Sequence, residues 1–131
     1  MFKKNLIKFI KSGGIPIIAG FQGINQKSRI TTLGRGASDY TAIMIAKYLK
    51  AQKCVIYTDV KGVMTSDPKI YKKAKKIDQI SYEEMLEMSS LGSKVMQSNS
   101  VQDARLNRID VNVKSSFVKN VGTLITKRKN I

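Results

Sequence analysis

The sequence predicts an α/β fold built on a parallel sheet. Two short, nearly continuous apolar runs, at residues 15–19 and 54–57, have the pattern of strands that are buried on both faces. Glycines at 34 and 36 and a helical pattern lie between them, which gives the order strand, glycine loop, helix, strand. The 42% of hydrophobic residues and 25% of charged residues also predict a packed core.

The first third of the chain contains one predicted helix and two predicted strands. Apolar residues recur at helical spacing over 2–11, with lysines on the other face, and Ser-Gly-Gly at 12–14 ends this helix. The strand at 15–19 follows. A polar loop over 22–29 then leads to a short strand over 30–33.

The helix after the glycines runs to about Lys50. Ser38 or Asp39 can cap its N-terminus, because both side chains accept hydrogen bonds from first-turn N–H groups. The strand at 54–57 comes next.

The second half begins with a helix that a capping box marks. Ser81 can bond the backbone of Glu84, three residues later, and the Glu84 side chain can bond back. Gly92 ends or kinks this helix. The remaining predicted elements are a helix over 95–106 and strands over 111–113 and 123–125.

The composition narrows the possible chemistry. The chain has no His and one Cys, so it has no internal disulfide, no common zinc-ligand spacing and no His-dependent nucleophile. A catalyst of this composition works by positioning and electrostatics, as phosphoryl transfer does. We predict no metal site, no membrane segment and a cytoplasmic location, because the sequence has neither an export signal nor a long apolar span.

The net charge of +15 has two interpretations. Nucleic-acid binding would use the basic residues to neutralise phosphates. A plain bias toward lysine explains the charge equally simply, since 19 of the 24 basic residues are lysine and few aromatic residues accompany them. We expect no specific nucleic-acid partner.

Three segments are candidate ligand sites. The glycine loop at 31–39 could bind an anion through backbone N–H groups and Arg35, or it could be an ordinary capped turn. Residues 57–69 follow a predicted strand, where α/β proteins often bind ligands, or they form two turns. Lys94 could meet a phosphate, or it could be a solvated lysine.

Together these segments resemble the aspartate kinases over residues 15–126. The motifs, in chain order, are GIPIIAGFQGINQKSRITTLGRGASDYTA, CVIYTDVKGVMTSDPKI, ISYEEMLEMSSLGSKVM, VKSSF and GTLIT. The resemblance implies the amino-acid kinase fold, a three-layer α/β/α sandwich with a mostly parallel sheet. It also implies transfer of the γ-phosphoryl group of ATP, which carries Mg2+, to the β-carboxylate of L-aspartate, the first step toward lysine, threonine, methionine and diaminopimelate.

The resemblance assigns roles to individual residues. It makes Asp39 and Lys94 catalytic, with Asp39 orienting lysines and Lys94 meeting the phosphates. The implied aspartate-binding residues are Arg35, Gly36, Ala37 and Ser38. The implied nucleotide-binding residues are Thr58, Asp59, Met64, Thr65, Ser66, Asp67, Pro68, Lys69, Ser93 and Lys94.

The chain departs from the family pattern at several of these positions. Ala37 replaces a glycine, which is harmful if the backbone there needs a positive φ. Met64 replaces a common tyrosine, Lys69 replaces a common arginine, and residues 97–100 replace a segment that contains Pro-Arg. We therefore expect weakened nucleotide binding.

Larger parts of the family pattern are missing from the 131 residues. The chain has no segment like KFGGTS, which carries a catalytic lysine, and no regulatory ACT domains. We expect residues 1–131 to form the nucleotide-side half of a kinase domain, truncated or split, with little activity alone and with an exposed sheet edge. Its partner would be a separately encoded N-terminal fragment or a second copy. The alternatives are a nonenzymatic nucleotide-binding module and a basic nucleic-acid binder.

Overall fold

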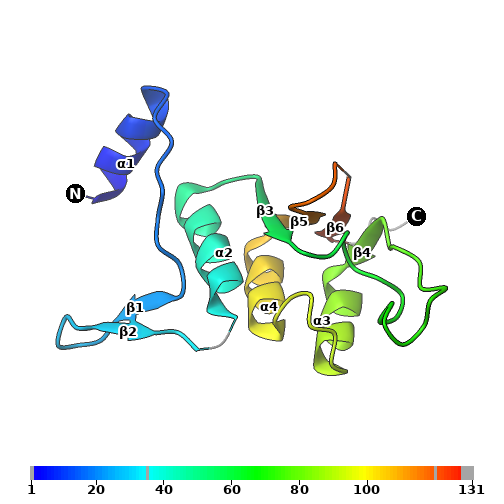
Figure 1. Cartoon of the computed structure of the whole chain (residues 1–131). Coiled ribbons are helices and arrows are strands. Elements are labelled where there is room, and N and C mark those ends of the chain that lie inside the picture. Colours follow the sequence, from blue (N-terminus) through cyan, green and yellow to red (C-terminus); the bar gives the residue numbers. More distant parts are fainter. Residues whose placement is uncertain (1, 35, 120, 128–131) are drawn as a thin grey trace.

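The computed structural model describes residues 2–34, 36–119 and 121–127. Three helices pack side by side against a four-stranded sheet, and an N-terminal arm of one helix and one hairpin extends away from them (Figure 1). The elements are α1 (Phe2–Lys11), β1 (Gln22–Ile24), β2 (Ile30–Thr32), α2 (Ala37–Leu49), β3 (Lys53–Thr58), β4 (Gln79–Ser81), α3 (Tyr82–Ser90), α4 (Ser98–Asn107), β5 (Asp110–Ser115) and β6 (Thr123–Thr126).

The main sheet has the strand order β3-β5-β6-β4. β3 is parallel to β5 and β4 is parallel to β6, whereas β5 and β6 are antiparallel. Two of the three strand pairs are thus parallel, and the predicted α/β class with a mostly parallel sheet is confirmed.

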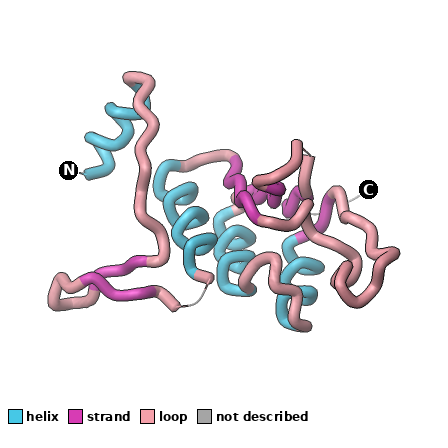
Figure 2. Tube along the Cα trace, in the orientation of Figure 1, coloured by secondary structure: helices cyan, strands magenta, loops and turns pink. Residues whose placement is uncertain are grey.

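The first predicted strand is wrong. Residues 14–20 form no strand and run as a loop (Figure 2), with Ile15 86% and Ile17 97% exposed. An apolar run becomes a strand only where its backbone pairs with another strand, and no strand within the described ranges pairs with this one. The predicted strand at 30–33 forms as β2, and its partner β1 lies inside the expected polar loop.

The N-terminus of α2 also differs from its prediction. Gly36 is the N-cap residue, in a left-handed conformation with φ 75°, and no side chain caps the helix. Ser38 and Asp39 lie inside the first turn. The predicted end is confirmed, because α2 stops at Leu49. The helix predicted over 2–11 forms as α1.

The capping box of α3 forms as predicted. The Glu84 N–H donates to Ser81 Oγ over 3.2 Å, and the Ser81 N–H donates to Glu84 Oε2 over 2.9 Å. Gly92 follows the end of α3 with φ 104°. α4 starts at Ser98 rather than at 95, and Met96 packs into the core from the preceding loop.

The core lies between the three helices and one face of the sheet. Tyr82 spans this layer, since its hydroxyl donates to the Ile109 carbonyl oxygen over 2.8 Å. Burial, with the nearby Asp110 carboxylate, raises the pKa of Tyr82 to about 12. The side chains without solvent exposure belong to both layers: Ile43, Val63, Met85, Ala104, Val111, Val113, Thr123 and Ile125.

The opposite face of the sheet is open at β3. Val55 is 40% and Tyr57 65% exposed, while Cys54 and Ile56, which alternate with them, are buried under the helices. β3 is also an edge strand of the sheet, as expected. None of the helices in the described part of the chain has the length and apolar character needed to cross a bilayer.

The buried hydroxyl of Thr123 joins three parts of the chain. It accepts a hydrogen bond from the Val63 N–H over 2.8 Å and donates to the Ile77 carbonyl oxygen over 2.5 Å. Val63 and Ile77 are the two ends of the long β3–β4 connection, and the Ile77 N–H donates to the Val63 carbonyl over 2.9 Å. Thr123 therefore anchors that connection to the start of β6.

We predict that Thr123→Val destabilises the fold by about 2–4 kcal/mol, because it leaves a buried N–H and a buried carbonyl without a partner while keeping the side-chain shape. Urea unfolding measures this loss. The matched control is Thr31→Val in the exposed strand β2, which we expect to change stability little. Equal losses in the two variants would contradict the anchoring role.

Candidate functional site

The chain order directs the loops before α2 and α4 toward the carboxyl ends of β3 and β5. Only three residues connect the end of α2 to the start of β3, and only two connect α4 to β5. Each helix therefore runs back along its strand, and its N-terminus lies near the carboxyl end of that strand. Ligands of open α/β sheets bind at this edge. Ligand-binding loops of this arrangement are therefore expected before α2, after β3 and before α4.

The glycine loop leads directly into α2. Arg35 lies outside the described residues. Gly36 needs its positive φ, and a Cβ added there would lie 2.4 Å from Gln97 Nε2, so this loop contacts the loop before α4. Ala37 is the first helical residue and has no left-handed backbone. The replacement of the family's glycine by Ala37 is therefore conformationally mild.

Asp39 faces the sheet from the first turn of α2. It lies on the same helix face as the buried Ile43 and Ala46, three to four residues apart. Burial raises the pKa of its carboxyl group, and the pKa of Cys54 on β3 is raised by burial and then by the Asp39 charge. No ion pair joins Asp39 to another residue in the described ranges. A half-buried carboxylate in this position is suited to pair with an incoming cation.

Thr58 and Asp59 end β3 at the same edge. The Thr58 hydroxyl donates to Asp59 Oδ1 over 3.1 Å, and the Thr58 carbonyl accepts from the Ser116 N–H over 2.8 Å. The second bond fixes the loop after β5 beside the end of β3.

Residues 64–69 form one arm of the loop that Thr123 anchors. Met64 pairs with Lys76, and Thr65 exchanges two hydrogen bonds of 2.9 and 3.0 Å with Lys75. Asp67 accepts from the Lys69 N–H over 2.8 Å, which shapes a turn. The segment therefore forms a turn, which is one of the two interpretations that the sequence left open. Thr65, Ser66, Asp67, Pro68 and Lys69 are nevertheless all exposed and open to a ligand.

Ser93 and Lys94 lie in the loop between α3 and α4. The Ser93 N–H donates to the Met88 carbonyl over 2.9 Å, which holds the loop against the end of α3. Lys94 is exposed, and no ion pair joins it to another residue of the described segments.

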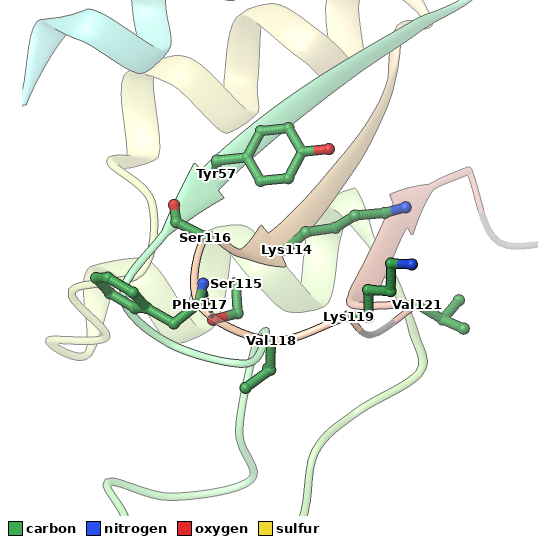
Figure 3. A pocket seen from close by; sticks show the side chains of 8 residues that line it. All are labelled: Tyr57, Lys114, Ser115, Ser116, Phe117, Val118, Lys119 and Val121. Carbon is green, nitrogen blue, oxygen red and sulfur yellow. Dashed lines mark hydrogen bonds between the residues drawn. The ribbon is translucent and has the colours of Figure 1, made fainter.

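A hollow of about 590 Å³ opens beside Tyr57, on the sheet face that the helices leave uncovered, and none of the site residues predicted from the sequence lines it. In Figure 3 the Tyr57 hydroxyl and the ammonium groups of Lys114 and Lys119 point to the same side, and Phe117 points to the other. None of these residues was predicted from the sequence to bind a ligand. The VKSSF motif at 113–117 was the sequence signal that pointed to this segment. The lining residues are Tyr57, Lys114, Ser115, Ser116, Phe117, Val118, Lys119 and Val121.

Comparison with known proteins identifies the family to which this chain belongs. The sequence profile of the amino acid kinase family matches residues 1–115. The chain belongs to the amino acid kinase family. An aspartate kinase of Stutzerimonas stutzeri is 52% identical over 117 residues, which are 89% of this chain and 28% of that protein. The aspartokinase of Rickettsia felis is 51% identical over 128 residues, which are 96% of this chain and 32% of that protein.

Solved structures agree with this membership. Aspartokinase III of E. coli, in complex with aspartate and ADP, matches with a TM-score of 0.86 and 39% identity over 96% of this chain and 29% of that one. UMP kinase from Bacillus anthracis, at 22% identity and a TM-score of 0.75, shares the fold alone. The resemblance to aspartate kinases and the amino-acid kinase fold are confirmed. The chain spans about a third or less of the length of these aspartate kinases.

The charge on Asp39 should cost this family member stability at neutral pH. The fold raises the pKa of the Asp39 carboxyl group above the ordinary 3.8. The folded chain therefore binds this proton more tightly than the unfolded chain does. As a result, the free energy of unfolding falls as the pH rises from 3.8 to the raised pKa. We predict that Asp39→Asn raises the melting temperature at pH 7, with the gain shrinking below pH 3.8.

Melting curves of Asp39→Asn across pH 3–7 measure this effect, with Glu87→Gln as the control, since Glu87 is exposed on α3 and is in no ion pair within the described ranges. A melting temperature below that of the unchanged chain at pH 7 would show that the helix N-terminus stabilises the carboxylate more than burial penalises it.

Proposed function

We propose that this chain is the nucleotide-side half of an aspartate kinase and transfers the γ-phosphoryl group of ATP to the β-carboxylate of L-aspartate. The observation that supports the proposal is the chain order, which starts α2 and α4 toward the carboxyl ends of the parallel strands β3 and β5, where Thr58 and Asp59 follow β3. Phosphoryl transfer depends on alignment and charge neutralisation, so it needs no His or nucleophilic Cys.

On the substrate side, Arg35, Gly36, Ala37 and Ser38 hold L-aspartate. The first-turn N–H groups of α2 lack a side-chain cap, and the positive end of a helix favours a carboxylate. Arg35 adds a two-pronged grip on a carboxylate. The exposed Ser38 hydroxyl adds a further hydrogen bond.

On the nucleotide side, Thr58, Asp59 and the exposed loop of residues 64–69 bind ATP, and Ser93 and Lys94 meet its phosphates. The 590 Å³ hollow lined by Tyr57 and residues 114–119 has room for a base and a sugar. Lys69 and Lys94 act as point charges. Mg2+ arrives with ATP, held by phosphate oxygens, and the described residues contain no cluster of three or more acidic, His or Cys side chains that could hold it instead.

Asp39 orients a lysine that this part of the chain does not supply. Its half-buried carboxylate has no cationic partner within the described ranges. We propose that a kinase segment absent from residues 1–131 brings that lysine to the site and completes the catalytic domain. The chain alone would then have little activity. We also propose a cytoplasmic location, where ATP and L-aspartate are available.

Complementation tests the enzymatic proposal. We predict that ADP release in the presence of ATP, Mg2+ and L-aspartate rises at least 100-fold when the N-terminal part of the Rickettsia felis aspartokinase is added, and that Asp39→Asn abolishes the gain. Glu87→Gln on the exposed side of α3 is the control. Full turnover by the chain alone would contradict the need for a partner.

Nucleotide binding is tested separately by calorimetry on the chain alone. We predict that Lys94→Ala weakens ATP binding about tenfold, the equivalent of one charged phosphate contact, whereas Lys47→Ala on the exposed side of α2 has no effect. ATP binding without any response to L-aspartate in the complementation assay would favour the nonenzymatic nucleotide-binding module.

A further inference from the structure

The hydroxyl group of Thr41 connects two separate parts of the chain. Thr41 lies in α2, one helical turn after Ala37, and its hydroxyl donates to the Ala37 carbonyl oxygen over 3.0 Å. The same hydroxyl oxygen accepts a hydrogen bond from the Phe21 backbone N–H over 3.1 Å. A hydroxyl group has one proton and two lone pairs, so it makes both bonds at once. Thr41 therefore holds the segment that leads into β1 against the first turn of α2.

Phe21 extends this connection to the glycine loop. Its carbonyl oxygen accepts a hydrogen bond from the Leu33 N–H over 3.0 Å. The residues bonded in series are thus Ala37, Thr41, Phe21 and Leu33. Only residues 34–36, the centre of the glycine loop, lie between the two ends of this series. The hydrogen bonds of Thr41 and Phe21 therefore hold both ends of that centre.

The backbone of Phe21 is strained, which shows that its surroundings hold it firmly. Its φ is 67°, in the left-handed region that residues with a large side chain rarely adopt. Close packing next to it agrees with this, because a Cβ added at Gly20 would lie 3.6 Å from Ser38 Cα and 3.7 Å from Thr41 Cβ. Strained residues persist only where neighbours fix them, and they cluster at ligand sites. The strain at Phe21 thus directs attention to the loop that it holds.

The centre of the glycine loop depends on these end contacts. Gly34 and Gly36 both have a positive φ, of 97° and 75°, and a Cβ added at Gly34 would contact nothing within 4 Å. Because glycine has more backbone freedom than any other residue, the placement of this segment depends on how its ends are held. Arg35 lies between the two glycines, and it is one of the proposed aspartate-binding residues.

We propose that Thr41 is a positioning residue for aspartate binding. Its hydroxyl acts through Phe21 and Leu33 on one end of the segment at 34–36 and through Ala37 on the other. This inference rests on the proposed function, since it names what holds the proposed substrate loop in place. No local pattern predicts the role, because the bond between Phe21 and Thr41 joins residues 20 positions apart.

Steady-state kinetics test the proposal in the chain complemented with the N-terminal part of the Rickettsia felis aspartokinase. We expect Thr41→Val, which keeps the side-chain shape, to raise the KM for L-aspartate about tenfold and to leave the KM for ATP within about twofold. Thr41→Ser keeps the hydroxyl and should restore the KM for L-aspartate. Equal changes in the two KM values for Thr41→Val overturn the proposal, as does a Thr41→Ser variant that is equally impaired.

The control variant is Ser90→Ala on α3. The Ser90 hydroxyl donates to the Glu87 carbonyl oxygen over 2.7 Å, which resembles the bond from Thr41 to Ala37, but it links no second segment within the described residues. Its loss should leave both KM values unchanged. A rise in the KM for L-aspartate equal to that of Thr41→Val would overturn the proposal.

Amide hydrogen exchange on the chain alone tests the same contacts without kinase activity. Thr41→Val should speed exchange at the Phe21 and Leu33 amides about tenfold, while the Val63 amide, which is bonded to Thr123, keeps its rate. Unchanged exchange at Phe21 and Leu33 overturns the proposal. Faster exchange, together with no L-aspartate-dependent ADP release by the complemented unchanged chain, contradicts the proposed function and still supports the hold of Thr41 on the loop.

Discussion

Strand β5 pairs with one parallel strand, β3, and one antiparallel strand, β6, and the rest of the structure depends on this pairing. Val111 and Val113 have no solvent exposure, and their strand runs parallel to β3 and antiparallel to β6. The carboxyl ends of β3 and β5 therefore meet the start of β6 at one edge. Thr123, at that start, then fixes both ends of the β3–β4 connection. The loops that carry the proposed ligand-binding residues precede α2, follow β3 or precede α4 (Figure 1).

The same edge concentrates groups that are costly to the fold. Asp39 is held in a half-buried position that raises its pKa, and the buried Ser100 hydroxyl has no hydrogen-bond partner among the described residues. The N-termini of α2 and α4 both lack capping side chains. α3, by contrast, has a complete capping box. Polar groups left unsatisfied near one edge of an otherwise well-bonded layer are the expected mark of ligand binding.

Most of the basic residues have no proposed ligand. In the lysine-rich stretch at 72–76, Lys76 pairs with Asp78 and donates to the Gly122 carbonyl over 3.0 Å, which is a structural role. The lysines with a proposed ligand, Lys69 and Lys94, lie on separate loops of the carboxyl edge. The function proposed here thus depends on where two or three cations stand rather than on the net charge of +15.

The sequence by itself determined the elements whose signals are local. The Ser81–Glu84 capping box, the apolar run of β3 and the helical spacing of α1 and α2 depend on neighbours within a few residues, and all of them form. The family motifs likewise indicated the candidate segments around Asp39, Thr58 and Lys94.

Only the tertiary structure decided the features that depend on distant partners. The run at 15–19 looks like a strand but finds none to pair with, whereas β1 and the three-residue β4 are too short and polar to predict and form because β2 and β6 lie beside them. The mild conformation of Ala37 and the hollow beside Tyr57 depend on how helix ends and loops pack against one another. Strand pairing and packing join residues far apart in the sequence, and no local pattern encodes them.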